Sequence, residues 1–392
     1  MFTTNNPPPP EKAVLAGLKT PDQDPVLFDA DLQEMQMLCT TAGATVSEKI
    51  VQKREKPNPA TYIGRGKLRE VARAMSSHKC KTFVIDAELA LGQVHNIEKV
   101  IKGKVIDRSQ LILDIFAQHA RTNEARIQVE LAQMYTLYPR LTHAWTHFSQ
   151  QVGGIGTRGP GEKQLEVDRR LVQKKISDLK KKLARIERSR TTQRKSRKGT
   201  FRVTLVGYTN VGKSSLLNAL SGSELLVENK LFATLDTATR RTYIPGTGTV
   251  IISDTVGFLR KLPHHLVASF KSTLEVVRNA NLLLIVMDAS CPWNSHQLQT
   301  VNDVLDDLGA HDIQRIHVVN KMDLVDDALE RKKLELAFPD AVFISAFNHE
   351  NINQLKEIIK ERINEYEKEN SIAAIIKRKS KELTTQQNRY PA

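Results

Sequence analysis

Residues 207–214 have the residue types and the spacing of a loop that binds phosphate. They read G-Y-T-N-V-G-K-S, which fits the pattern G-x-x-x-x-G-K-[ST]. In that pattern the glycines let backbone N–H groups close around a phosphate, the lysine reaches the β- and γ-phosphates, and the hydroxyl binds Mg²⁺. Lys213 and Ser214 are therefore candidates for the phosphate and Mg²⁺ contacts.

The segments on either side of this loop are predicted to be a strand and a helix. An apolar run, 201–206, precedes the loop, and residues 215–220 have helical composition. This order separates a phosphate-binding loop from an ordinary glycine-rich turn, and the N-terminus of the helix adds positive potential. The expected nucleotide contacts in this segment are Gly207, Tyr208, Thr209, Asn210, Val211, Gly212, Lys213, Ser214 and Ser215.

A second motif, D-T-V-G at residues 254–257, follows the apolar run 249–253. An aspartate at a strand end is where a P-loop enzyme places its second contact to Mg²⁺, and the glycine offers a backbone N–H to the γ-phosphate. The aspartate and the glycine, with Lys213, are therefore the predicted catalytic residues. The expected contacts of the motif are Asp254, Thr255, Val256 and Gly257.

Two later motifs indicate that the base is guanine. N-K-M-D follows the apolar run 314–319, and S-A-F follows 341–344. The aspartate can accept two hydrogen bonds from N1–H and the exocyclic amine of guanine, a donor pair that adenine lacks. Four motifs in this order resemble those of the translation-factor-related GTPases and predict GTP and GDP as ligands. The expected base contacts are Asn320, Lys321, Met322, Asp323, Ser345, Ala346 and Phe347.

The composition predicts a cytoplasmic protein with two or three domains. The chain has 392 residues, enough for a full core in each domain. Its three cysteines have no C-x-x-C spacing, which argues against a disulfide framework or a zinc site. No apolar run approaches the roughly 18 residues of a membrane span. We expect a monomer without stable membrane insertion.

The positive charge of the chain is concentrated in one segment. The net charge is +14, and between Arg169 and Lys198 there are 14 lysines and arginines against Asp178 and Glu187. A run of charged residues is usually a solvated helix face. Here the excess of basic over acidic residues is too large for ion pairs between neighbouring turns of a helix to neutralise. A polyanion is the favoured partner, RNA before DNA or membrane. The expected contacts in this run are Arg169, Arg170, Lys174 and Lys175.

The same region predicts a long antiparallel helical hairpin, because apolar residues recur at alternating spacings of four and three. One seam begins at Ile127 and ends at Trp145, and the other begins at Val172 and ends at Ile186. Pro139 falls inside the first seam and is expected to kink or break that helix. At about 1.5 Å per residue, arms of about 20 residues project the tip by roughly 30 Å.

The predicted tip of the hairpin is rich in glycine, which no helix tolerates well. Two interpretations remain open: a loose connector, or a loop fitted closely against an RNA backbone. The expected RNA contacts of the tip are Gly153, Gly154, Gly156, Arg158 and Gly159.

The fold class is predicted to be α/β, with a P-loop GTPase domain preceded by a small α/β domain and the hairpin. Residues 1–24 are expected to be a disordered proline-rich tail, 25–108 the α/β domain, 109–198 the hairpin and basic linker, 199–366 the GTPase domain, and 367–392 a basic polar tail. Within 25–108 the expected strands are 26–28, 44–51, 82–86 and 104–106, and the expected helices are 32–42, 66–76 and 91–101.

Several independent motifs resemble those of the HflX family of ribosome-associated GTPases, over roughly residues 25–365. They include D-I-F-A-Q, Q-V-E-L-A-Q, G-G-I-G, R-G-P-G-E and D-R-R ahead of the P-loop, and L-F-A-T-L-D and D-T-V-G-F after it. The resemblance implies binding to the large ribosomal subunit and its rRNA, activation by that subunit, and a role in splitting or rescuing stalled ribosomes. It also implies that the tip reaches toward the peptidyl-transferase region.

The resemblance further implies that Thr234 is the switch threonine, a catalytic residue that binds Mg²⁺ when GTP is present, with Phe232, Ala233 and Leu235 beside the nucleotide. Thr237-Ala238 stands where the family pattern has Pro-Thr, so the first switch departs from that pattern here.

Phe258 follows D-T-V-G, where regulatory GTPases often carry a glutamine that orients the attacking water. Phenylalanine cannot form that hydrogen bond, so we expect slow intrinsic hydrolysis that depends on switch ordering by the ribosome. Two alternatives stay open: a GTP-dependent RNA-processing or ribosome-assembly factor, and a non-catalytic RNA-binding adaptor.

Overall fold

The computed structural model describes residues 10–148, 160–195, 200–222, 231–232, 238–261 and 271–387. The chain forms two compact units. The N-terminal unit comprises Met1–Ser196, Glu228–Asp236 and Gly257–Thr273, and the G unit comprises Arg197–Val227, Thr237–Val256 and Leu274–Ala392. The N-terminal unit therefore includes two short stretches that lie within the GTPase part of the sequence.

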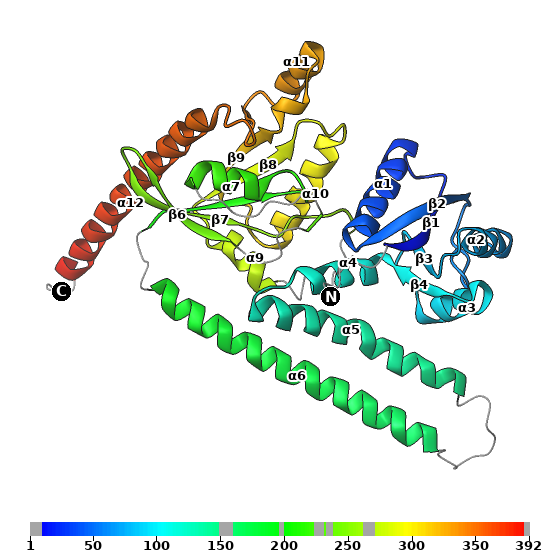
Figure 1. The fold of residues 1–392 in the computed structure, drawn as a ribbon. Coiled ribbons are helices and arrows are strands. Elements are labelled where there is room, and N and C mark those ends of the chain that lie inside the picture. The colour runs from blue at the N-terminus through cyan, green and yellow to red at the C-terminus, as the bar shows by residue number, and fades with distance from the viewer. Residues whose placement is uncertain are drawn as a thin grey trace, which may run out of the picture. The chain divides into compact units, whose positions relative to one another are not determined.

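The N-terminal unit contains a four-stranded parallel sheet in the order β2–β1–β3–β4 (Figure 1). The strands are β1 (Glu11–Lys19), β2 (Ala44–Lys53), β3 (Thr82–Ile85) and β4 (Lys104–Asp107). The helices between and after them are α1 (Pro25–Thr41), α2 (Arg65–Ser77), α3 (Leu91–Ile101) and α4 (Arg108–His119). The prediction of alternating strands and helices around a parallel sheet is confirmed.

The prediction of a disordered tail over residues 1–24 was wrong for residues 10–24, because β1 is a central strand of this sheet, and residues 1–9 lie outside the described residues. Its residues from Ala13 to Leu18 are all buried, as expected for a parallel strand covered on both faces. The proposed strand 26–28 was also wrong, since it is the first turn of α1. Asp24 caps this helix by accepting from the N–H of Val26 at 2.7 Å, and Pro25 suits the first helical position.

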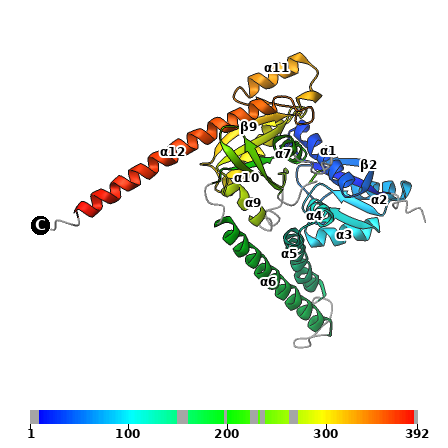
Figure 2. The ribbon, with the colours of Figure 1, turned by 60° about the vertical axis from the view of Figure 1, so that its left-hand side comes forward.

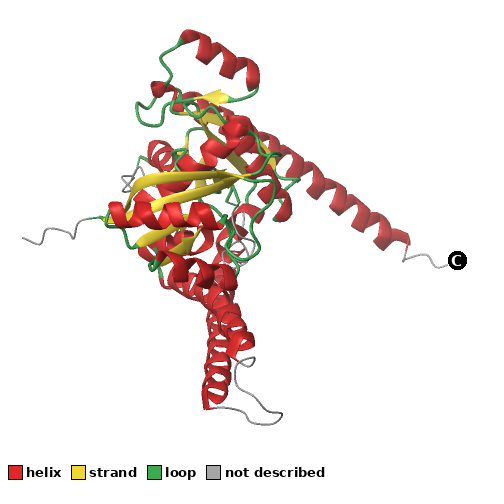
Figure 3. Ribbon diagram, turned by 90° about the vertical axis from the view of Figure 1, so that its right-hand side faces the viewer, coloured by secondary structure: helices red, strands yellow, loops and turns green. Residues whose placement is uncertain are grey.

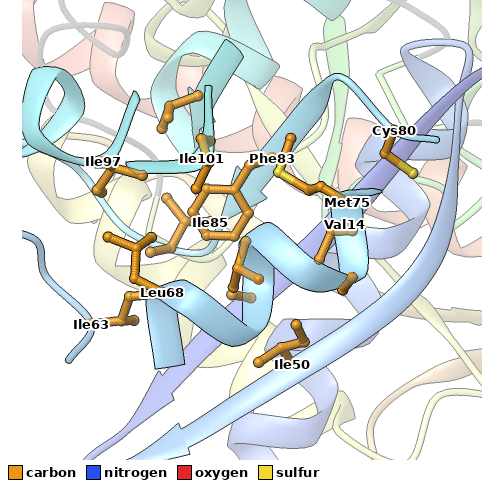
Figure 4. Close-up of a cluster of buried hydrophobic side chains, with 14 of the residues drawn as sticks. Val14, Ile50, Ile63, Leu68, Met75, Cys80, Phe83, Ile85, Ile97 and Ile101 are labelled. Carbon is orange, nitrogen blue, oxygen red and sulfur yellow. The ribbon is translucent and has the colours of Figure 1, made fainter. Parts of the chain in front are cut away.

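One face of the sheet carries a continuous hydrophobic core. Phe83 and Ile85 of β3 are fully buried and contribute to it with Leu68 of α2 and Ile97 of α3 (Figure 4). Val14 of β1 belongs to the same cluster, which explains why the first strand is needed to complete the unit.

The hairpin consists of α5 (Asn123–Phe148) and α6 (Pro160–Lys195), which lie side by side (Figure 3). Its core contains residues from both predicted seams, so the seam prediction is confirmed there. The helix is not broken at Pro139, and that alternative was wrong. Proline has no backbone N–H, so α5 lacks one hydrogen bond at Pro139. The seam contacts on the preceding turns keep the helix intact. The core residues are Ile127, Leu131 and Leu179, with Met134, Tyr135, Ile176, Leu183 and Ile186 packed against them.

The G unit contains a six-stranded sheet in the order β10–β9–β8–β5–β7–β6, in which β6 is antiparallel to β7 and the other pairs are parallel. The strands are β5 (Arg202–Gly207), β6 (Thr239–Ile244), β7 (Gly248–Asp254), β8 (Leu282–Asp288), β9 (Gln314–Asn320) and β10 (Val342–Phe343). The helices are α7 (Lys213–Ser221), α9 (Lys271–Arg278), α10 (Asn294–Asp307), α11 (Ala328–Ala337) and α12 (Ile352–Gln387), with a 3₁₀ turn at Met322–Leu324.

The segment predicted as a basic polar tail continues α12 as one long helix as far as Gln387 (Figure 2). Its first part is amphipathic, with Ile352, Leu355, Ile359 and Ile363 buried. These residues recur at helical spacing and fix the start of the helix in the G unit.

Leu179→Ala is predicted to weaken the hairpin, because Leu179 is 1% exposed and a buried leucine truncation typically costs about 2–5 kcal/mol. Leu171→Ala on the same helix is the matched control, since Leu171 is 59% exposed and should change stability by less than about 0.5 kcal/mol. The measurement is amide hydrogen exchange of α5 and α6 in the full chain. Equal protection in the two variants would contradict the packing described here.

Candidate nucleotide-binding site

Two glycines of the phosphate-binding loop occupy positions that no other residue fits. Gly207 has a φ of +155°, and a Cβ there would lie 2.3 Å from the carbonyl oxygen of Val286. Gly212 has a φ of +90°, and its Cβ would lie 2.4 Å from Nδ2 of Asn320. The loop therefore needs glycine for both close approach and backbone conformation. It joins β5 to the N-terminus of α7, as the sequence predicted.

Lys213 begins α7 and is buried. Its Nζ donates to the carbonyl oxygen of Tyr208 at 2.6 Å and to that of Gly207 at 3.3 Å. Burial lowers the pKa of Lys213 to about 8, while the nearby Asp254 carboxylate acts in the opposite direction. The ammonium is thus held within its own loop, charged at neutral pH and poorly compensated, which suits a phosphate ligand.

Asp254 ends β7 and is fully buried. Burial raises its pKa, an effect opposed by Lys213 and by the hydrogen bond from Ser214. Its Oδ2 accepts from Ser214 Oγ at 2.6 Å, whereas Oδ1 has no hydrogen-bond partner among the described residues. A carboxylate and a hydroxyl placed together are the oxygen ligands of a hard divalent cation, so this pair fits a metal that accompanies a phosphate.

Asn320 connects the guanine motifs to the phosphate loop. Its Nδ2 donates to the carbonyl oxygen of Val211 at 2.9 Å, and its Oδ1 accepts from the N–H of Ala346 at 2.9 Å. Ser345 Oγ donates to Asp323 Oδ1 at 2.5 Å, which orients the carboxylate predicted to contact guanine. The N-K-M-D and S-A-F motifs are therefore brought together.

One residue of this region was missed by the sequence reasoning. Asp288 ends β8, a strand that was not predicted, and its Oδ2 lies 2.7 Å from Nζ of Lys321. Lys321 has a φ of +66°, so the ion pair helps to hold an unusual backbone conformation. The apolar run 282–287 followed by an aspartate was the available signal.

The remaining predicted residues differ in their burial and position. Tyr208, Thr209, Val211, Thr255, Val256 and Met322 are buried and shape the walls of the motifs, whereas Phe347 is 84% exposed. Phe232 is buried in the N-terminal unit. Gly257 is buried, and Asn210 and Ser215 are partly buried. The predicted residues outside the described ranges are Ala233, Thr234 and Leu235, and in the hairpin tip Gly153, Gly154, Gly156, Arg158 and Gly159.

The basic face of α6 is a second candidate surface. The four cations predicted to bind RNA, Arg169, Arg170, Lys174 and Lys175, are all exposed. Arg169 Nε donates to the hydroxyl of Tyr138 at 3.0 Å, and Lys175 Nζ lies 2.8 Å from Glu130. Cross-helix contacts thus orient part of this face without burying it.

Family models match three consecutive parts of the chain: "GTP-binding GTPase N-terminal" over residues 29–117, "GTP-binding GTPase Middle Region" over 119–197, and "50S ribosome-binding GTPase" over 202–321. GTPase HflX of Flavobacterium psychrophilum is 43% identical over 376 residues, covering 91% of each chain. GTPase HflX of Escherichia coli is 42% identical over 357 residues, covering 90% of this chain and 83% of the relative.

This chain belongs to the GTPase HflX family. It is a GTP-binding protein and a GTP-hydrolysing enzyme, consistent with the order of its four motifs. A GTP-binding protein of Sulfolobus solfataricus in complex with GDP is similar to it with a TM-score of 0.48 and 24% identity, covering 91% of this chain and 99% of that one. In the described part of this HflX chain, no helix has the length and apolar composition of a membrane span.

Asp323→Asn is predicted to reverse base preference. The variant amide presents an N–H donor where guanine also presents donors, so GTP affinity should fall by at least about tenfold, or roughly 1.4 kcal/mol. Xanthosine triphosphate, which has an acceptor at that position, should bind better than it does to the wild type. Competition binding measures both, with Asp326→Asn on the exposed turn nearby as control. Unchanged GTP binding would refute the role of Asp323.

Proposed function

We propose that this GTPase binds the large ribosomal subunit through rRNA and acts on stalled or idle ribosomes by splitting or rescuing them. The observation that carries the proposal is the exposed basic face of α6, whose charge exceeds what the hairpin neutralises. The match of the G unit to a family described as a 50S ribosome-binding GTPase supports the same partner. Such a role requires a cytoplasmic protein, and we propose that it acts as a monomer.

Mg²⁺ is the proposed metal of the GTP site. Ser214 Oγ and Oδ1 of Asp254, which has no hydrogen-bond partner among the described residues, would provide oxygen ligands, and Thr234 is the proposed switch ligand. When bound, the cation would neutralise charge on the β- and γ-phosphates. Lys213 would bind the same phosphates, and the N–H of Gly257 would contact the γ-phosphate. Each of these contacts positions the phosphoryl group and stabilises developing charge.

Hydrolysis by the free protein is proposed to be slow. Phe258 follows Gly257 and is 2% exposed, so its side chain contributes to packing and not to orienting water. The ribosome is then required to order the switch residues around the attacking water, as the resemblance to ribosome-associated GTPases suggested.

The test of this function is GTP turnover with and without purified large ribosomal subunits, at low and moderate salt. Stimulation that falls as salt rises is expected, because phosphate contacts by lysine and arginine release counterions. Tight GTP binding without stimulation would contradict the proposal and favour a role in RNA processing or subunit assembly. Lys213→Ala should abolish turnover while RNA binding persists.

The double variant Lys181→Gln/Lys182→Gln on α6 is predicted to weaken subunit binding about threefold to tenfold and to reduce its salt dependence. Lys332→Gln/Lys333→Gln on α11 is the matched control. Both pairs are adjacent exposed lysines. In each pair one lysine forms an ion pair with an acidic residue three positions earlier on its own helix. Sedimentation with large subunits measures binding, and equal losses in both variants would show that only net charge matters.

Phe258→Gln is predicted to change intrinsic turnover by less than about threefold, because switch order and not this side chain limits the reaction. The buried position makes a packing defect possible, so Phe258→Leu serves as control for lost aromatic volume. Single-turnover GTP hydrolysis without ribosomes is the measurement. A gain of about a hundredfold in the glutamine variant alone would overturn this account.

A further inference from the structure

Three carboxylates gather near the carboxyl end of the N-terminal sheet. Asp86 follows β3, while Asp31 and Glu34 lie on α1. Arg108, the first residue of α4, is 1% exposed and donates to Asp86 at 2.8 Å and also to Glu34. The carboxyl end of a parallel sheet is where open α/β folds bind ligands. Within the described residues this cluster of carboxylates needs more positive charge than Arg108 supplies.

The additional charge comes from residues 260 and 261, which belong to the same compact unit. Arg260 Nη1 lies 3.2 Å from Asp31 Oδ1. Lys261 Nζ lies 2.7 Å from Asp31 Oδ2 and 3.6 Å from Asp86 Oδ2. Arg108 Nη2 also donates to the backbone carbonyl oxygen of Arg260 at 2.8 Å. The cluster thus recognises both the side chains and the backbone of this segment.

Buried apolar side chains occur in both short stretches of the unit. Phe258 and Leu259, directly before the two cations, are 2% and 1% exposed. Phe232, from the other short stretch in this unit, packs edge-on against Phe116 of α4 with ring centroids 4.7 Å apart. The stretch that contains Phe232 is therefore anchored to α4 by an aromatic contact, and the stretch that contains Phe258 is held by the ion pairs of Arg260 and Lys261.

Lys261 adopts a conformation that its ion pairs help to maintain. Its φ is +50°, in the left-handed region that a residue with a side chain rarely occupies. Such conformations persist where surrounding contacts determine them. The two carboxylates that face Lys261 provide those contacts, so removal of its charge should free the backbone of the segment.

We propose that Asp31, Asp86 and Arg108 form a binding site for residues 258–261 that pre-organises Gly257 for the γ-phosphate of GTP. Gly257 directly precedes this segment, and Asp254, three residues before Gly257, accepts a hydrogen bond from Ser214. Because the residues on both sides of Gly257 are held in place, Gly257 loses less conformational entropy when its N–H binds the γ-phosphate. GDP lacks the γ-phosphate, so the site favours GTP selectively. The inference rests on GTP binding and is independent of the ribosome.

The test compares the affinities of the full chain for a non-hydrolysable GTP analogue and for GDP. In Lys261→Met the analogue should bind about fivefold more weakly, while GDP affinity changes less than about twofold, within the usual range of coupling between sites. Lys261 is 45% exposed, so folding should be preserved. Lys67→Met, which removes an ion-paired lysine on α2, is the matched control and should alter neither affinity.

A double-mutant cycle with Asp31→Asn checks that the effect passes through the ion pair, since the double variant should bind the analogue no more weakly than the weaker single variant. Hydrogen exchange of the peptide containing residues 257–261 should also rise in Lys261→Met. Unchanged analogue affinity, tighter analogue binding, equal loss for both nucleotides, or unchanged exchange would each overturn the proposal. None of these outcomes depends on ribosome stimulation.

Discussion

The burial of Lys213 beside Asp254 is the constraint on which the G unit depends. Burial shifts the pKa of both groups toward the neutral form, while each favours the charge of the other. Burying two charges costs desolvation free energy, and this cost is offset only when neighbouring groups satisfy both charges with ion pairs and hydrogen bonds. Ser214 and the loop carbonyls do part of this, and a nucleotide with its metal would do the rest. The glycines at 207 and 212 let the loop adopt its conformation and pass close to Val286 and Asn320, where a Cβ would clash.

A comparable arrangement of charges organises the N-terminal unit, although no phosphate is involved. Arg108 lies at the start of α4, and α5 begins only a few residues after α4 ends at His119. The helix that begins with Arg108, the partner of Asp86 and Glu34, is thus followed closely by the hairpin that carries the basic face.

The parts of the molecule that the sequence predicted well depend on short-range patterns. The phosphate loop, the N-K-M-D motif and the helical seams are each defined by spacing within a few residues. The strand Glu11–Lys19 was missed because its apolar run is short and follows a proline-rich start. The pairing of Asp31 with Lys261 could not be predicted, since it joins residues far apart in the sequence. The burial of Phe258 could be seen only in the fold, because no short-range pattern around D-T-V-G-F indicates it.

The central place of β1 has a consequence for synthesis, in which the N-terminus emerges first. β1 pairs with both β2 and β3, so its hydrogen bonds cannot be completed until Ile85 has left the ribosome. Asp31 can form its ion pairs with Arg260 and Lys261 only after the chain has been synthesised as far as residue 261. During that interval a nascent chain carries an acidic edge on an otherwise folded sheet. Assembly of the first unit is therefore finished only by the synthesis of the second, unlike the independent folding of successive domains.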